Sequence, residues 1–416
     1  MGINFQKLRE LCVIGDGIHT SIERQDSGVP YFTSKNFKPD GLDLTNVDYI
    51  SESDYERYFI DKKSLLNPIS QDIVFGIIGT IGTPYLVKPE DRFGISSSVA
   101  ILRSKKKILP KYLYLYMSSH IFQSTVDIMK SGSAQGFLSL EMIGNLPIIA
   151  PDLRIQEKIA AILHTYDNLI EANKLRIGIL ERTIEELYKE WFVRSPKRKM
   201  IELKPELPSS WDLVTVEDLC KEIRKSVKLE DLDSKQTYLG LEHLSRKSIS
   251  LYKSSTTDSV SSNKLAFQKF DILFGKIRPY LHKVCIANFD GVCSTDILVI
   301  RPKDNIHLIY LLFTIFSDAF IDLANVSSKG TKMPRADWDF LKKTELRLPP
   351  RDILESFNEI CMPRIDQIFI FLQQIKLLEG MKAALLPRLV SGELSVDDLD
   401  IQYPPSMQTS DEAEEK

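Results

Sequence analysis

The chain is short of cysteine and of long apolar runs, and both shortages narrow the class of protein. Its five cysteines are an odd number without a Cys-X-X-Cys spacing, which argues against disulfides and a structural zinc site and favours a reducing cytoplasm. No stretch approaches the roughly 20 uninterrupted apolar residues of a membrane helix. The N-terminal "MGINFQKLRE" lacks the apolar core of a signal peptide. We therefore expect a cytoplasmic protein that does not enter a membrane.

Motifs of catalysis and cofactor binding are also absent. There is no GxxxxGK[ST] loop and no GxSxG, and the six histidines show no HxxxH or HExxH spacing. "PDLRIQEK" from Pro151 resembles a nuclease motif, but its acids are too close, and Asp152 stands where a helix N-cap is expected. "FGIIGTIG" from Phe75 continues into the strand-like "TPYLV", which predicts a tight β turn instead of a nucleotide loop. We predict no catalytic residue, metal or cofactor in this chain.

The net charge of −3 does not single out a nucleic-acid binder, but the charge is unevenly distributed. Residues 397–416 hold seven acids and one lysine, so the rest of the chain carries a formal charge of +3. The composition of this end predicts a disordered acidic tail. A mildly basic body permits contact with DNA without requiring it.

An internal repeat at a spacing of about 198 residues organises the chain. "DIVFGIIGTIGTPYLV" from Asp72 matches "DILFGKIRPYLHKVCIA" from Asp271, and "GISSSVAILRSK" from Gly94 matches "GVCSTDILVIRPK" from Gly291. A solenoid needs three or more short units. Two long units instead predict two similar domains related by a pseudo-two-fold axis.

Each half begins with short β-branched runs bounded by Gly, Pro or Asp, which predict strands. A helical segment follows, over roughly 111–129 in the first half and 306–325 in the second, and then a short strand marked by proline. We therefore predict an α+β fold with two strand-rich domains, residues 1–150 and 201–350.

Long helices are predicted after each domain. Residues 152–194 contain no proline and one glycine, and their apolar residues recur every three or four positions. About 40 helical residues would span roughly 60 Å, so this helix needs a partner, and residues 351–396 supply a less regular one. We expect the two to form an antiparallel coiled-coil spacer. The predicted seam of the first helix is Ile155, Ile159, Ile162, Tyr166, Leu169, Asn173, Ile177, Leu180, Ile184, Leu187 and Trp191.

Two polar or irregular residues leave alternatives open. Asn173 either fixes the register of the helix pair or faces solvent. Pro363 either kinks the second helix or marks its first turn. Trp191, Phe192 and the "YLYLY" stretch from Tyr112 could dock partner proteins, although core packing is the more common fate of such residues.

The chain resembles the DNA-specificity subunit of type I restriction–modification enzymes. The stretches that carry the resemblance are "IGDGIHTSIERQDSGVPYFTSKNFKPDGLD", "YISESDYERY", "LAFQKFDILFGKIRPYLHKVCIANFDGVCSTDILVIRPK", "PDLRIQEKIAAILHTYDNLIEANKLRIGILERTIEELYKEWF" and "LLPRLVSGEL". On this resemblance the chain divides into target-recognition domain 1 (1–150), a central spacer helix (151–200), target-recognition domain 2 (201–350), a C-terminal spacer helix (351–396) and the acidic tail (397–416).

The resemblance implies a subunit that performs no chemistry. It would bind double-stranded DNA, with each recognition domain reading one half of a split, asymmetric sequence and the helices setting the unread gap. Two methyltransferase subunits would bind S-adenosylmethionine and methylate adenine. Restriction subunits that use ATP and Mg²⁺ would join for cleavage. The alternative is a scaffold protein that recruits partners through its coiled coil without reading DNA.

Loops are the places where such domains would read DNA. In "VIGDGIHTSI" we predict a turn at Gly15 and Gly17 that presents the opening loop. Arg and Lys suit guanine or phosphate, whereas Gln and Asn suit adenine. The candidates in the first domain are Asp16, His19, Thr20, Ser34, Lys35, Asn36, Lys130, Ser131, Ser133 and Gln135. Those in the second are Arg224, Lys225, Glu242, His243, Lys276, Arg278, Tyr280, Lys329, Thr331, Lys332 and Arg335.

Overall fold

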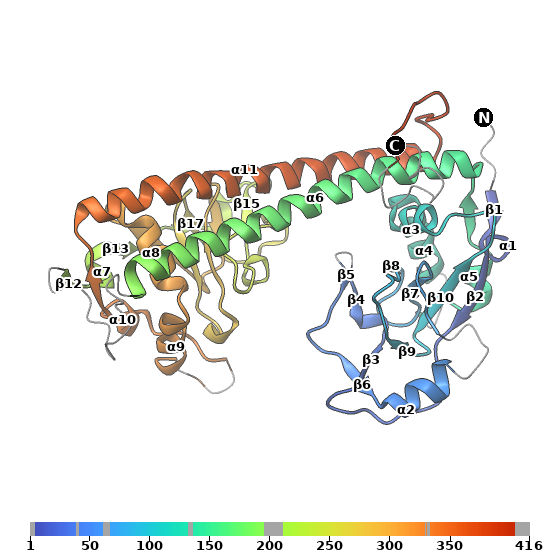
Figure 1. Cartoon of the computed structure of the whole chain (residues 1–416), viewed down its shortest axis with the longest axis horizontal. Helices are drawn as coiled ribbons and strands as arrows, with labels where there is room; N and C mark the ends of the chain where they lie inside the picture. Colours follow the sequence, from blue (N-terminus) through green and yellow to red (C-terminus); the bar gives the residue numbers. More distant parts are fainter. Residues whose placement is uncertain are drawn as a thin grey trace. The chain divides into compact units, whose positions relative to one another are not determined.

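Figure 1 shows the computed structural model of the chain, which describes residues 5–38, 41–60, 67–131, 136–194, 211–328, 330 and 333–403. It divides into two compact units, Met1–Asn168 with Leu378–Lys416, and Leu169–Leu377. Each unit combines antiparallel strand pairs with helices, which confirms the predicted α+β class.

The first unit is built around one four-stranded antiparallel sheet. The strands of the whole unit are β1 (Phe5–Lys7), β2 (Cys12–Asp16), β3 (Val29–Phe32), β4 (Phe37–Lys38), β5 (Gly41–Leu42), β6 (Asp48–Ile50), β7 (Ile73–Gly76), β8 (Pro84–Leu86), β9 (Gly94–Ile95), β10 (Val99–Ser104) and β11 (Pro147–Ile149). The central sheet has the order β2-β10-β7-β8. Along β10, Ala100 and Leu102 face one apolar core and Val99 and Ile101 face another. This alternation follows from the two-residue period of a strand.

Four short helices, α1 (Leu8–Leu11), α3 (Pro110–Ser118), α4 (His120–Ser131) and α5 (Leu140–Gly144), contribute to the core that contains Ala100 and Leu102. The fifth, α2 (Glu52–Tyr55), buries Tyr55 in the other core. In α3, Tyr112, Leu113, Leu115 and Tyr116 are buried in the core of the unit. The "YLYLY" stretch therefore packs internally and does not offer a docking surface.

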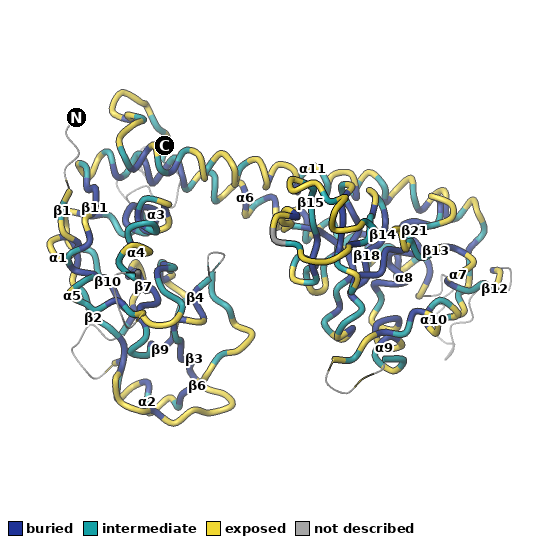
Figure 2. The backbone as a smooth tube through the Cα atoms, turned by 180° about the vertical axis from the view of Figure 1, so that it is seen from behind, coloured by how far each residue is buried: buried dark blue, intermediate teal, exposed yellow. Residues whose placement is uncertain are grey.

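The second unit repeats this plan. Its strands are β12 (Asp212–Thr215), β13 (Cys220–Glu222), β14 (Ser226–Val227), β15 (Thr237–Leu239), β16 (Ser255–Thr256), β17 (Lys264–Phe267), β18 (Ile272–Gly275), β19 (Val284–Ile286), β20 (Gly291–Cys293), β21 (Ile297–Pro302) and β22 (Glu345–Leu348). Its short helices are α7 (Val216–Leu219), α8 (Leu308–Phe316), α9 (Asp318–Val326) and α10 (Trp338–Leu341). The sheet order β13-β21-β18-β19 matches that of the first unit strand for strand. Figure 2 shows β18 and β21 in the buried interior of this unit.

The repeat extends to single side chains at Asp72 and Asp271. Each aspartate is buried at the start of a central strand and accepts two hydrogen bonds from an arginine of the adjacent strand. Arg103 donates to Asp72 at 2.9 and 2.7 Å, and Arg301 donates to Asp271 at 2.6 and 2.7 Å. The residue before each aspartate has a positive φ, 72° in one copy and 71° in the other. Two such matching details confirm that both units descend from one structural plan.

Removing one of these carboxylates should destabilise its unit. In Asp271→Asn the Arg301 guanidinium loses its buried counter-charge, and we expect the free energy of unfolding to fall by about 3 kcal/mol. Asp72→Asn should cost a similar amount. Denaturant unfolding checks both, with Asp322→Asn on the exposed face of α9 as a control that should change stability by less than about 0.5 kcal/mol. Equal stability of Asp271→Asn and the control would contradict the importance of the pair.

Two long helices, α6 (Leu153–Tyr188) and α11 (Arg351–Val390), confirm the prediction that a long helix follows each domain. Within the second unit, Asn173 Nδ2 donates to Gln374 Oε1 at 3.1 Å, and the ring centroids of Phe192 and Phe357 lie 4.7 Å apart. Later residues of the first helical segment thus contact earlier residues of α11. The helices are therefore antiparallel, as expected.

The seam of α6 is correct in outline but shifted in places. Asn173 is only 3% exposed and lies on the seam, so the solvent-facing alternative is wrong. Leu169 is 47% exposed, and its neighbour Ile170 is buried instead. A straight helix has 3.6 residues per turn, so a strict heptad drifts off the buried face. Pro363 lies inside α11, which begins at Arg351. The first-turn alternative is therefore wrong, and a kink at this proline stays a prediction.

Across the part of the chain that the structure describes, no single helix is long and apolar enough to span a membrane. The bent pair Asn305–Phe316 and Asp318–Val326 reaches the required length and composition only when joined. All residues of α8, which forms most of its first member, are buried in the unit. This burial accounts for the apolar character of the pair.

Candidate nucleic-acid interface

Two loops of the second unit that are about 58 residues apart in sequence lie side by side. One follows β18 and the other precedes α10. The backbone contacts that join them are an antiparallel bridge between Ile277 and Arg335, a hydrogen bond from Arg278 N–H to Pro334 O at 2.8 Å, and one from Ala336 N–H to Lys276 O at 3.0 Å. The candidates Lys276, Arg278, Tyr280 and Arg335 therefore belong to one surface, which we call the paired loops.

The first unit contains the same pair of loops with different side chains. Ile78 and Phe137 form the corresponding antiparallel bridge, and Leu138 N–H donates to Ile77 O at 2.9 Å. The loop residues here are "GIIGTIGT" from Gly76 and contain no charge. One backbone plan thus presents a cationic surface in one unit and an uncharged one in the other.

The arginines of the second unit differ in how their charges are used. Arg224 pairs with Glu222 at 2.6 Å, and Arg335 pairs with Asp296 at 3.2 Å. Arg278 is exposed, and its guanidinium makes no ion pair or hydrogen bond with any residue that the structure describes. Asp296 was missed in the sequence analysis. Its place at the end of "CSTD", just before an apolar strand, was the available signal.

The other members of the paired loops are placed by their neighbours. Lys276 is half-buried, whereas Tyr280 has 56% of its surface exposed. Pro279, between Arg278 and Tyr280, is buried. Pro279 therefore anchors the loop in the unit, and the flanking Arg278 and Tyr280 are exposed to solvent.

The opening loop of the first unit holds a polar pair. His19 Nε2 and Asp16 Oδ2 lie 2.8 Å apart, and 73% of the His19 side chain is exposed. Thr20 is exposed next to them. These three candidates form a small polar surface that can exchange hydrogen bonds with a ligand.

The predicted turn at Gly15 and Gly17 is wrong. Gly15 lies within β2, opposite Ile101 of β10. Gly17 extends this pairing, because its N–H donates to Val99 O at 3.0 Å. A Cβ on Gly17 would lie 2.3 Å from the carbonyl oxygen of Ile95, so this glycine permits close backbone packing and does not form a turn.

The "TSKN" loop presents only one of its three candidates. Ser34 and Asn36 are each 5% exposed. Ser34 Oγ donates to Ile78 O at 2.5 Å, and Asn36 Oδ1 accepts from Thr33 N–H at 2.9 Å. Their polar atoms form hydrogen bonds inside the unit, so these two side chains are not available to contact DNA. Lys35, between them, is exposed.

His243 has the position in the second unit that Asn36 has in the first. Its Nδ1 accepts from Gly240 N–H at 2.9 Å at the start of a short 3-10 turn. Burial lowers the pKa of His243, which keeps the ring in the neutral form that can accept this bond. We assign His243 a structural role, whereas Glu242 is exposed.

The remaining candidates are less informative. Lys130 Nζ pairs with Asp127 at 2.9 Å at the end of α4, and Lys225 is exposed after β13. The backbone of Ser131 belongs to α4. The candidates Ser133, Gln135, Lys329, Thr331 and Lys332 lie outside the described residues, as does the side chain of Ser131.

The described residues show no metal-binding cluster. Among the described residues, no group of three or more His, Cys, Asp or Glu side chains is placed to hold a metal ion. All five cysteines are buried. Burial raises the pKa of the Cys285 thiol to about 12, which keeps it protonated and unreactive.

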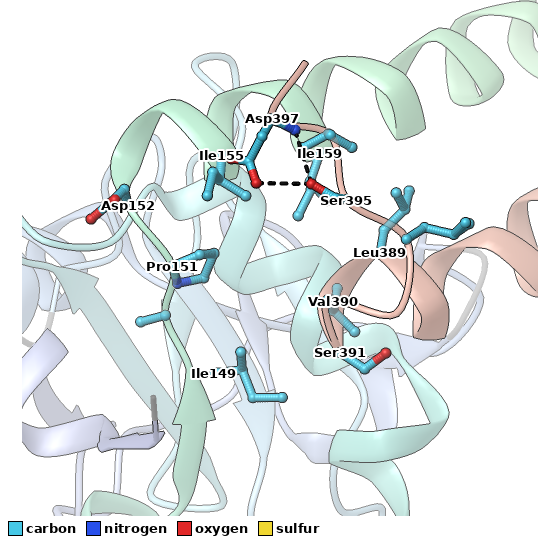
Figure 3. A pocket seen from close by; sticks show the side chains of 14 residues that line it. Ile149, Pro151, Asp152, Ile155, Ile159, Leu389, Val390, Ser391, Ser395 and Asp397 are labelled. Atoms are coloured by element: carbon cyan, nitrogen blue, oxygen red, sulfur yellow. Dashed lines mark hydrogen bonds between the residues drawn. The ribbon is translucent and has the colours of Figure 1, made fainter. Parts of the chain in front are cut away.

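A cavity of about 560 Å³ lies elsewhere in the first unit, where α6 begins and α11 ends. Figure 3 shows Ile149, Ile155, Leu389 and Val390 on its walls, with Asp397 hydrogen-bonded to Ser395 at its rim. Its walls are mostly aliphatic. This composition suits packing against another apolar surface better than chemistry on a bound substrate.

A protein family described as the type I restriction modification DNA specificity domain matches the chain over residues 2–182 and 208–377. The two matched stretches coincide with the two halves of the internal repeat, and each includes one pair of loops and part of a long helix.

Named relatives and a solved structure agree with this match. The type I restriction enzyme MjaIX specificity subunit of Methanocaldococcus jannaschii is 24% identical, over 95% of this chain and 94% of that protein. The EcoDI specificity subunit of Escherichia coli is 26% identical over 65% of each. The crystal structure of a type I S subunit from M. genitalium shares the fold with a TM-score of 0.54 at 15% identity, covering 96% of this chain and 97% of that one.

Proposed function

Because the chain belongs to the family of type I restriction–modification DNA specificity proteins, we propose that it reads a split, asymmetric DNA sequence with one recognition domain per half-site. One observation carries this proposal. The same pair of loops occurs in both units, with a cationic surface in one and an uncharged surface in the other. A duplicated frame with different side chains is what two unequal half-sites require.

Recognition would depend on side chains that reach base edges in the grooves, with cations on phosphates setting the register. In the second domain we assign this role to Lys276, Arg278, Tyr280 and Arg335. The sequence adds Lys329, Thr331 and Lys332, which lie outside the described residues. In the first domain we assign it to Asp16, His19, Thr20 and Lys35. The sequence adds Lys130, Ser131, Ser133 and Gln135, of which Ser133, Gln135 and the side chain of Ser131 lie outside the described part of the chain. Arg224, Lys225 and Glu242 complete the set.

The chain is the non-catalytic subunit of its complex, as its membership in a family of specificity subunits confirms. We propose that two methyltransferase subunits using S-adenosylmethionine, and restriction subunits using ATP and Mg²⁺, bring the chemistry to the DNA it selects in the cytoplasm. The antiparallel pair α6 and α11 would set the unread gap between half-sites and receive the methyltransferase subunits.

Exposed aliphatic residues on α6 offer a surface for this docking. Leu175 is 63% exposed and Ile179 is 55% exposed, one turn apart on the same helix. Trp191 and Phe192, which the sequence suggested as docking residues, pack instead against Phe357. A partner helix that covers Leu175 and Ile179 would gain apolar burial without disturbing the seam.

Charged residues on this surface should weaken assembly without unfolding the chain. We expect Leu175→Lys with Ile179→Lys to raise the Kd for the methyltransferase partner at least tenfold, because apolar anchors dominate such interfaces. Thermal melting of the isolated chain should be unchanged. Calorimetric titration measures the Kd, and Glu171→Lys on the same helix is the matched control. Unaltered affinity of the double variant would place docking elsewhere.

DNA recognition and a scaffold role are separated by an electrophoretic shift assay with the reconstituted methyltransferase complex. We expect preferred binding to a subset of duplex sequences at moderate salt. Equal affinity for all duplexes would favour a scaffold that recruits partners through its helices. Removing the DNA-specificity chain from the complex should abolish the preference, because the partners alone lack the paired loops.

A further inference from the structure

We propose that Arg278 reads a guanine in the half-site of the second recognition domain. This inference rests on the proposed DNA-reading function and assigns one base class to one residue. Arg278 differs from the other candidates in three respects: its backbone conformation, the contacts that hold its loop, and the exposure of its side chain.

The backbone of Arg278 is held in a conformation that arginine avoids. Its φ and ψ are 52° and 63°, in the left-handed region. A side chain with a Cβ is disfavoured there, and the following Pro279 restricts the preceding residue further. In the first unit the matching position, after the bridging Ile78, is Gly79 with φ 77°. The shared loop shape thus calls for glycine, and the second domain departs from it by placing arginine there.

The loop that carries Arg278 is rigid. Arg278 N–H donates to Pro334 O at 2.8 Å, and its carbonyl accepts from Leu281 N–H at 2.8 Å. Pro279 is buried, and at the end of the loop His282 is 4% exposed with Nε2 donating to Phe316 O at 2.7 Å. A strained residue persists only where the surrounding contacts determine its conformation. These contacts fix the backbone of Arg278 and therefore the direction in which its side chain leaves the loop.

The side chain of Arg278 is available for a ligand. It is exposed, and no described residue neutralises it, whereas Arg224 and Arg335 are each paired with an acid. An exposed, unpaired guanidinium on a rigid loop suits a duplex that presents acceptors in a fixed arrangement.

A guanine explains these features better than a phosphate does. The major-groove edge of guanine offers two acceptors, N7 and O6, that match the planar fork of arginine. A phosphate needs only a positive charge, which a flexible residue in an unstrained position supplies at lower cost. Placing the fork in a strained and rigid loop gains nothing for a phosphate contact and gains orientation for a base contact.

The decisive variant is Arg278→Gly, because it removes the side chain and restores the residue that the loop shape favours. The complex reconstituted with its methyltransferase partner is tested on duplexes that vary one position of the target at a time. We expect one guanine of one half-site to lose its preference over the other bases, by about 10- to 100-fold. The other half-site stays unchanged, and the melting temperature of the chain does not fall.

Arg278→Lys separates base reading from phosphate contact, since it keeps the charge and loses the fork. Under the proposal the lysine variant also discriminates less at the same guanine. If the preference is kept in both variants and only the salt dependence of affinity weakens, Arg278 contacts phosphate and the proposal is overturned. Lys343→Ala, at an exposed position after α10 and outside the proposed DNA-binding residues, is the matched control and should leave this guanine preference intact.

Failure of the inference differs from failure of the proposed function. A wild-type complex with no sequence preference removes the DNA-reading function itself. If the wild-type complex reads a split target and Arg278→Gly keeps the base preference at every position, the DNA-reading function stands. Only the role of Arg278 is then refuted.

Discussion

Replacing residues 201–350 with the recognition domain of another member of the family is expected to change one half of the methylated target and leave the other half as it was. The second unit has its own apolar core around Leu273, Val299 and Phe267, so its loops are supported without the first domain. The expected change is complete, because new loops carry a new set of base contacts.

The exchange must respect the contacts between this domain and the long helices. Tyr188 Oη lies 3.0 Å from Thr314 Oγ1, and the rings of Phe192 and Tyr310 are 5.1 Å apart. Both partners on α8 lie inside the exchanged segment. The domain that is inserted should therefore carry a tyrosine and a threonine at these positions, or receive them by mutation. A loss of activity then does not result from lost packing between the domain and the long helix.

Mapping of methylated adenines in a genome that expresses the hybrid complex gives the result. The reciprocal exchange of residues 1–150 is the control and should alter the opposite half-site. If the hybrid methylates the original sequence, or if both half-sites change together, the two domains do not read DNA independently.

A matched insertion of seven residues into both long helices is expected to lengthen the unread gap by about three base pairs, since two helical turns add about 10.5 Å and base pairs are about 3.4 Å apart. Seven residues also keep the apolar face within about 20° of its original direction. The insertion points follow from the pairing of Asn173 with Gln374 and of Arg176 with Phe371. They lie after Asn168 in α6 and after Leu378 in α11, next to the boundary of the two compact units, so that the contact of Phe270 with Phe369 is kept.

An insertion into α6 alone provides the contrast. It would shift every later residue of α6 relative to α11 and separate the buried contacts of Phe192 with Phe357. We expect loss of stability and of methylation instead of a longer gap. A matched double insertion that methylates the original spacing would contradict the role of the helices as a spacer.

The parts of the fold that the sequence predicted are those with a strong local or repeated signal. The repeat starting at Asp72 and Asp271 can be recognised in the amino-acid sequence, and the structure contains a matching ion pair at each aspartate. The long helices follow from apolar spacing without proline breaks. Where the seam was misplaced, at Leu169, the cause was the small difference between a heptad and the true helical period.

The details that were mispredicted depend on contacts between distant segments. Gly17 lies against Ile95, and the polar atoms of Ser34 bond to Ile78. Neither neighbour is visible from the local sequence, so an exposed turn and an exposed serine were natural but wrong expectations.

The strain at Arg278 was also overlooked, although the sequence did contain a signal. Aligning the two halves of the repeat places this arginine opposite Gly79, and a glycine in one copy indicates a position where φ is positive. Comparing the copies residue by residue would have distinguished Arg278 from the other basic residues of its loop.

The central claim is that this chain gives a methyltransferase complex a split target with two unequal halves. The most direct measurement is single-molecule mapping of methylated adenines on genomic DNA modified by the reconstituted complex. The account predicts one asymmetric motif with a fixed run of unspecified bases between its halves. A contiguous or palindromic motif, or methylation without any motif, would contradict it.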